Sequence, residues 1–167
     1  MVTVKPCQEE DIALLREHIP TPGQPERHTT RFERQQHGHS TFLIAWAGAL
    51  PVGAGELLWR GCSAPEINQH YPDCPELNGL DVWPPELRSR GIGTALIAAA
   101  EKLAHQHGRH RIGLGVDDGN PRAAALYLRL GYRETGRHYL DRYAYVDSDG
   151  TRHEIADPAR FLVKDLP

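Results

Sequence analysis

The sequence lacks the features that mark several protein classes. Its 167 residues carry 19 Lys and Arg against 22 Asp and Glu, so it has no basic excess of the kind that suits nucleic-acid binding. Its three cysteines are an odd number and match no zinc-ligand spacing, which disfavours a disulfide framework and a structural metal. We therefore expect a reduced, cytoplasmic protein that holds no metal and binds no nucleic acid.

Long hydrophobic runs are also missing. The longest apolar stretch reads FLIAWAGALPVGAG, and it is shorter and more broken by Gly and Pro than the roughly 20 residues of a membrane span. Charged residues at Lys5 and Glu9 come too early for a signal peptide. These features predict no membrane association. The chain length suits one domain, residues 1–167, with enough residues to bury a core.

The order of expected elements predicts an α/β fold. Strands are expected at 41–48 and 52–61, joined by a turn, and again at 77–82 and 111–116. Helices are expected at 94–107, where apolar residues recur at helical spacing, and from Pro121 to Gly131. Two further strands, 151–155 and 160–166, are expected after a turn at DSDG. Strands that alternate with helices predict a mixed α/β sheet.

Residues 88–96, which read RSRGIGTAL, indicate a site for an anion. Two arginines precede Gly91 and Gly93, and a helix is expected directly after them. A helix N-terminus presents unpaired N–H groups and about half a positive charge, and glycine lets a phosphate approach those groups. A tight strand-to-helix turn would explain the glycines equally well. Leu96 stands where the dinucleotide fingerprint needs a third glycine.

A second motif follows this loop along the chain. Asn120, Ala123, the pair Leu126-Tyr127 and the pair Gly131-Tyr132 occur in that order. Together with Arg88-Ser89-Arg90-Gly91-Ile92-Gly93, they resemble the acyl-CoA-binding region of the GNAT family of N-acetyltransferases, over residues 77–133. The resemblance implies a mixed, largely antiparallel central sheet with splayed middle strands, flanked by helices. It also implies transfer of an acetyl group from acetyl-CoA to a primary amine in a ternary complex.

The same resemblance implies roles for particular residues. Tyr127 would be the general acid that protonates the leaving thiolate, although its spacing also suits packing on an apolar helix face. Backbone N–H groups of 89–94 would bind the pyrophosphate, and the Val82 N–H would bind the thioester oxygen. Asn120 is a helix cap and would also contact the CoA arm. The expected cofactor-binding residues are Leu80, Asp81, Val82, Arg88, Ser89, Arg90, Gly91, Ile92, Gly93, Thr94 and Asn120.

The general base is where this sequence departs from the family. Many members place a glutamate four residues before the valine, but here that residue is Asn78, which cannot accept a proton. Glu76 would share that face of an ideal strand and is the first candidate. Glu56, Asp81 and a base-free route through water are the alternatives. This departure leaves two other functions open. One is a domain that binds CoA without catalysis; the other is an acyltransferase that uses another acyl group or a hydroxyl acceptor.

The acceptor is expected to be the amine of a small molecule or peptide. Residues 56–81 contain five carboxylates against Arg60 alone, and such an acidic rim would attract a cationic amine. An ordinary solvated loop would have the same composition. The resemblance is also compatible with a homodimer, but no surface in the sequence can be assigned to it.

Overall fold

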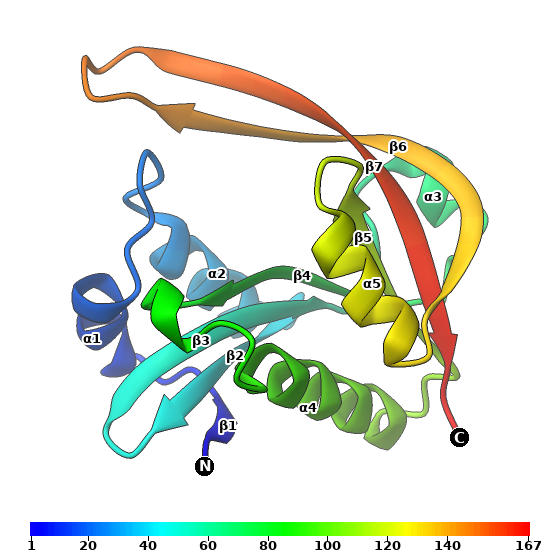
Figure 1. Cartoon of the computed structure of the whole chain (residues 1–167), viewed down its shortest axis with the longest axis horizontal. Coiled ribbons are helices and arrows are strands. Elements are labelled where there is room, and N and C mark those ends of the chain that lie inside the picture. Colours follow the sequence, from blue (N-terminus) through cyan, green and yellow to red (C-terminus); the bar gives the residue numbers. More distant parts are fainter.

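A computed structural model of residues 1–167 shows one seven-stranded sheet flanked by helices (Figure 1). The strand order is β1-β2-β3-β4-β5-β7-β6, and only β4 and β5 are parallel neighbours. The strands are β1 (Thr3–Pro6), β2 (Ser40–Ala47), β3 (Leu50–Leu58), β4 (Glu76–Val82), β5 (Arg111–Asp117), β6 (Arg133–Val146) and β7 (Arg152–Asp165). The mixed, largely antiparallel sheet expected from the sequence is confirmed.

Different helices cover the two faces of the sheet. The helices are α1 (Asp11–His18), α2 (Arg27–Gln36), α3 (Pro65–Asn68), α4 (Ile92–Gln106) and α5 (Pro121–Arg129), with a short 3-10 turn at Pro85–Leu87. On one face Leu15 of α1 packs with Phe42 of β2. On the other face Leu96 of α4 packs with Leu43, the next residue of β2. The alternating side chains of one strand thus serve two separate cores.

The middle of the sheet opens between β4 and β5. These strands pair only at Glu76 with Gly113 and at Leu77 with Leu114. Beyond Leu77, β4 continues to pair with β3 as far as Val82, but β5 has moved away. The edge of β4 that faces β5 is therefore unpaired over its second half, as splayed middle strands require.

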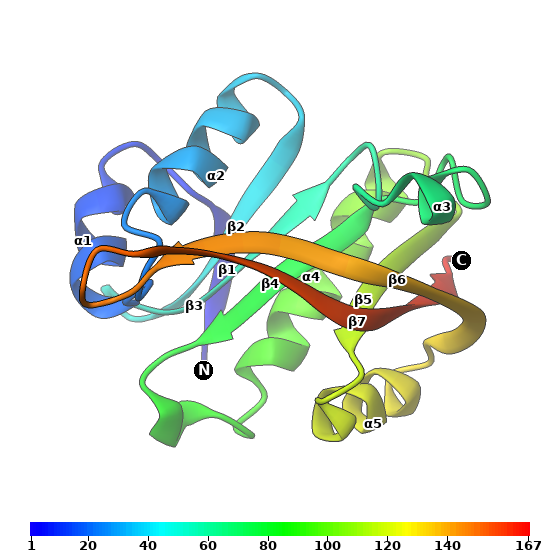
Figure 2. The ribbon, with the colours of Figure 1, turned by 90° about the horizontal axis from the view of Figure 1, so that it is seen from above.

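Strands β6 and β7 form a long hairpin that arches over the sheet (Figures 1 and 2). The sequence predicted two short strands where the structure has the continuous β7, so that prediction is wrong. Pro158 lies within β7 and pairs only with β6, because the pairing of β7 with β5 begins at Ala159. A proline is tolerated at a position without a second neighbouring strand.

The turn end of this hairpin contacts the connection between α1 and α2. The Val146 N–H donates to the Gly23 carbonyl at 2.9 Å. The Gln24 side-chain amide donates to the Ala144 carbonyl, also at 2.9 Å. The hairpin is thus anchored at both ends, at the sheet and at this connection, and it covers the space below it. None of the helices has the length and apolar character that a membrane crossing demands.

Candidate active site

A cavity of about 1100 Å³ lies under the hairpin, beside the opening between β4 and β5. Its walls come from β3, β4, β5, α2 and the connection before α2, and residues of β6 and β7 form its roof. The predicted catalytic residues Glu76 and Tyr127 both line it, as does Leu80. A smaller cavity of about 200 Å³ is lined by Asp81, Val82 and Arg88. The fold thus brings the predicted acid and base to one cavity.

Glu76 is a buried carboxyl group without a cationic partner. Only 2% of the residue is exposed, and the Asn78 amide nitrogen donates to its Oε1 at 3.1 Å. Burial raises its pKa to about 7, against the lowering effects of hydrogen bonds from Asn78 and Cys62. A carboxylate with this pKa can accept a proton near neutral pH and release it again.

Glu56, the alternative base, is held in an ion pair. Its two carboxylate oxygens accept hydrogen bonds from Nε and Nη2 of Arg34, each at 2.8 Å. The Nε atom of Arg31 lies 3.6 Å from Oε1 of the same carboxylate. Both carboxylate oxygens are thus hydrogen-bonded to Arg34 and a second guanidinium group lies nearby, which suits a structural role.

Tyr127 packs on the apolar face of its helix and also lines the large cavity. Its ring packs against the core on the α4 side and makes an edge contact with Tyr132, with ring centroids 6.4 Å apart. It also lines the large cavity, and its hydroxyl makes no hydrogen bond within the chain. Burial raises the pKa of this phenol, which therefore stays protonated at neutral pH. A protonated phenol at the cavity wall is chemically able to donate a proton.

The roof of the cavity contains residues that the sequence did not single out. Tyr139 and Asp141 of β6 line the cavity, together with Asp117 at the end of β5. The Tyr139 hydroxyl lies so close above Gly115 that no side chain would fit there. Burial and the neighbouring Asp157 and Asp117 raise the pKa of Asp141. The alternation in YLDRY places residues 139 and 141 on one strand face, but only the curvature of the hairpin turns that face towards Glu76.

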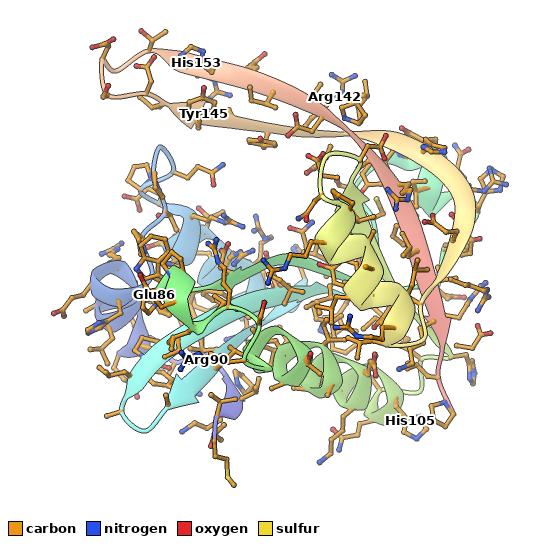
Figure 3. The ribbon with its side chains drawn as sticks, viewed as in Figure 1. Glu86, Arg90, His105, Arg142, Tyr145 and His153 are labelled. Atoms are coloured by element: carbon orange, nitrogen blue, oxygen red, sulfur yellow. The ribbon has the colours of Figure 1, made fainter.

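The loop before α4 has the geometry expected of an anion site. Gly91 adopts φ 86°, which favours glycine, and a Cβ atom at Gly91 or Gly93 would meet nothing within 4 Å. The surface above the helix N-terminus is therefore open. Thr94 and Arg90 are exposed, and Arg90 projects from the loop at the start of α4 (Figure 3), whereas Ile92 is buried. The open N-terminus of a 15-residue helix can accept a phosphate.

Two other arginines lie at this loop. The Arg88 Nε donates to the Val82 carbonyl at 3.4 Å, so Arg88 ties the loop to the end of β4. Arg122 of α5 donates to the hydroxyl of Ser89, a residue with φ 63°. The sequence did not identify Arg122, because only the fold brings the start of α5 beside the loop.

Asn120 caps α5 as predicted. Its side-chain oxygen accepts a hydrogen bond from the Ala123 N–H at 3.1 Å, and Pro121 occupies the first helical position. A contact between Asn120 and the CoA arm stays a prediction. No three His, Cys, Asp or Glu side chains are grouped in a way that could hold a metal ion.

The charge of the cavity differs from the acidic rim expected from residues 56–81. Glu56 and Glu76 line the cavity, but the exposed Glu66 and Asp73 do not. Helix α2 adds the three cations Arg27, Arg31 and Arg34 to the same wall. The expectation was wrong because it counted charges along one segment, whereas the sheet places α2 beside β3 and β4.

Comparison with known proteins agrees with this geometry. The sequence model of the acetyltransferase (GNAT) family matches residues 10–132. An uncharacterized N-acetyltransferase of Methanocaldococcus jannaschii is 46% identical over 50 residues, which are 30% of this chain and 22% of that protein. The present chain therefore matches only about a fifth of the length of this relative.

Solved structures of N-acetyltransferases have the same fold. An N-acetyltransferase from Staphylococcus aureus superposes with a TM-score of 0.69 at 17% identity, over 100% of this chain and 99% of that one. The spermidine N-acetyltransferase from Vibrio cholerae, solved in complex with CoA and spermine, gives 0.67 at 15% identity, over 98% and 95%. At these identities the likeness concerns the fold alone.

Proposed function

Because this chain belongs to the acetyltransferase (GNAT) family, we propose that it transfers an acetyl group from acetyl-CoA directly to a primary amine. The observation that carries the proposal is the buried Glu76 carboxyl group, whose pKa of about 7 suits a general base. It lies in a cavity that adjoins the opening between β4 and β5, and Tyr127 lines the same cavity. Asn78 has no carboxylate, but Glu76 supplies one on the same strand. This favours a catalytic protein over a domain that only binds CoA.

In the proposed reaction Glu76 first makes the amine nucleophilic. An alkylamine has a pKa of about 10.4, so only about one molecule in a thousand is neutral near pH 7.4. Glu76 accepts a proton from the ammonium group, and the neutral nitrogen attacks the thioester carbon. A C–N bond forms and the C–S bond breaks as the carbonyl returns. Tyr127 gives its proton to the leaving thiolate and regains one from the new amide nitrogen, while Glu76 passes its proton to solvent.

The backbone is proposed to hold the thioester and the CoA phosphates. The unpaired edge of β4 supports an arm bound along Leu80, Asp81 and Val82, with the Val82 N–H directed to the developing oxyanion. The side chains of Leu80 and Val82 pack on the core, so only their backbone is free for this role. The open N-terminus of α4 supports pyrophosphate binding by residues 89–94.

The size and charge of the cavity support a small amine or the end of a peptide as acceptor. The β6–β7 hairpin crosses over the sheet (Figure 2), and residues of both strands line the cavity, so we expect an acceptor that enters beneath the hairpin. Asp117 and Asp141 line the cavity, where their carboxylates would attract an ammonium group. Acceptors of this class carry a positive charge until Glu76 removes the proton.

A thermal-shift experiment tests acetyl-CoA binding. At one hundred times the dissociation constant, a ligand stabilises by about 2.7 kcal/mol, which for a domain of this size raises Tm by roughly 5–10 °C. Gly91→Glu should abolish the shift, because it adds bulk and negative charge at the phosphate site. Gly136→Glu is the matched control: Gly136 also has positive φ and open space above it, but lies on β6. An equal shift in both variants would exclude the loop as the phosphate site.

A further inference from the structure

Two arginines of the cavity wall point to a second binding feature of the acceptor. We infer that the acceptor carries an oxyanion as well as its amine, and that Arg27 and Arg31 bind this oxyanion. The inference rests on the proposed function, because it concerns the same cavity. The ligand class is an aliphatic amino carboxylate, or an amine with another oxyanion such as a phosphonate, in which several carbons separate the two groups.

The guanidinium groups of Arg27 and Arg31 meet above one glycine of β4. A Cβ atom at Gly79 would collide with Nη2 of both arginines. Gly79 adopts φ 61° beside an irregularity in the pairing of β3 with β4, so the strand has both the backbone shape and the space for them. Two like charges so close together repel each other, and an anion that contacts both would relieve this repulsion.

Neither arginine has a carboxylate at hydrogen-bond distance. The nearest carboxylate oxygen to Arg31 belongs to Glu56, at 3.6 Å from its Nε, and the nearest to Arg27 belongs to Asp81, at 3.6 Å from its Nη1. Arg34 differs, because it takes both oxygens of Glu56 at 2.8 Å. Glu56 is therefore shared: Arg34 takes hydrogen bonds to both of its oxygens, and Arg31 lies 3.6 Å away without a hydrogen bond to it.

Arg31 also keeps an unused donor. Its Nη2 donates to the Gly79 carbonyl at 2.9 Å, but Nη1 is buried and has no hydrogen-bond partner. Only 2% of Arg31 is exposed, and burial lowers its pKa to about 10. A buried donor without a partner is costly, and a guanidinium group binds oxyanions better than any other side chain. Arg27 and Arg31 both line the cavity, and we assign the binding of one oxyanion to this pair of guanidinium groups.

The position of this receptor relative to Glu76 limits the length of the acceptor. Glu76 and Gly79 are three residues apart on β4, which corresponds to roughly 10 Å along a strand. Asn78 lies between them, bonded to Glu76 through its side chain and to Arg31 through its carbonyl. An α-amino acid is too short to place its reacting amine at Glu76 and its carboxylate at both arginines. A linear amino acid with the amine at the far end of the chain fits this separation.

Matched acids and amides test the inference. The probes are the terminal amino acids from glycine through β-alanine and 4-aminobutanoate to 6-aminohexanoate, each with its carboxamide, which has the same shape but no charge. We expect the longer acids to give kcat/KM values at least about tenfold above those of their amides. In Arg27→Gln this ratio should fall towards one, mainly through KM. The control Arg137→Gln removes an exposed arginine of β6 and should keep the ratio.

The outcomes separate this inference from the proposed function. Amides that react as well as acids at every length, or an undiminished preference in Arg27→Gln, would overturn the oxyanion receptor and leave acetyl transfer intact. A normal acetyl-CoA shift without acetylation of any acid would also overturn it. Loss of both the shift and all turnover would instead remove the proposed function. The phosphonate analogue of the best acid distinguishes the two oxyanions, because the tighter binder identifies the natural group.

Discussion

Glu56 and Glu76 lie on neighbouring strands, line the same cavity and are almost equally buried, at 1% and 2% exposure. Their partners differ completely. Glu56 is bound by Arg34 and lies near Arg31, whereas Glu76 has only an amide and a thiol as donors. A buried glutamate therefore holds α2 through an ion pair at position 56, whereas at position 76 it is able to exchange a proton. Charge partners, rather than burial, decide which of the two roles a buried carboxylate can take.

The largest effect is expected for Glu76→Gln. Removal of a general base typically costs a factor of about 10² to 10⁴ in turnover. Glutamine retains the shape of the side chain, so the thermal shift caused by acetyl-CoA should persist. Thiol release with a reactive amine and the thermal shift measure the two quantities on one sample. Turnover within a few fold of the natural protein would instead assign deprotonation to water.

Glu56→Gln should lower the free energy of unfolding rather than the rate of acetyl transfer. It leaves Arg31 and Arg34 without their carboxylate, and breaking a buried ion pair costs about 3–5 kcal/mol. Denaturant unfolding measures this loss. Asp165→Asn breaks the exposed pair with Arg133 and serves as control, with an expected cost below about 1 kcal/mol. If both variants lost the same small amount of stability, the structural role assigned to Glu56, in contrast to Glu76, would be wrong.

The pH dependence of stability tests the raised pKa of Glu76. Burial raises the pKa of Glu76 from 4.5 to about 7, so the folded state holds this proton more tightly than the unfolded state. The resulting stabilisation is complete below pH 4.5 and is lost as the pH rises through 7, on the order of 3 kcal/mol in total. Glu76→Gln lacks this dependence, so its stability relative to the natural protein should rise between pH 4.5 and 8. A constant difference in unfolding free energy over that range would mean that Glu76 has an ordinary pKa.

Local sequence signals were sufficient for the fold and for one part of the site. Asn120 with Pro121 predicted the start of α5, and the glycines at 91 and 93 predicted the open loop before α4, because caps and turns depend on a few adjacent residues. The alternation along β5 likewise predicted a strand. The pattern of elements then led to the mixed sheet that the structure confirms.

The walls of the cavity could not be predicted in the same way. Arg27, Arg31 and Arg34 lie in a polar segment whose composition does not say what it faces. Tyr139 and Asp141 reach Glu76 only because the β6–β7 hairpin bends over the sheet and rests on the connection before α2 (Figure 1). These contacts join residues about 60 to 120 positions apart, and a single sequence contains no local signal for them.

The smallest effect concerns Asn78, which lies opposite Glu56 on β3 and donates to Glu76. Its hydrogen bond lowers the pKa of Glu76 by favouring the charged form, so Asn78→Leu should raise that pKa. Leucine has the same branching and number of side-chain heavy atoms, but it cannot donate the hydrogen bond. In the profile of kcat/KM against pH, the limb that rises near pH 7 should move upward by about half a pH unit to one pH unit. Glu56→Gln should leave this limb in place, because the pair that it breaks does not include Glu76. If instead the limb moved in Glu56→Gln and stayed fixed in Asn78→Leu, the titrating base would be Glu56, and the roles of the two carboxylates would be reversed.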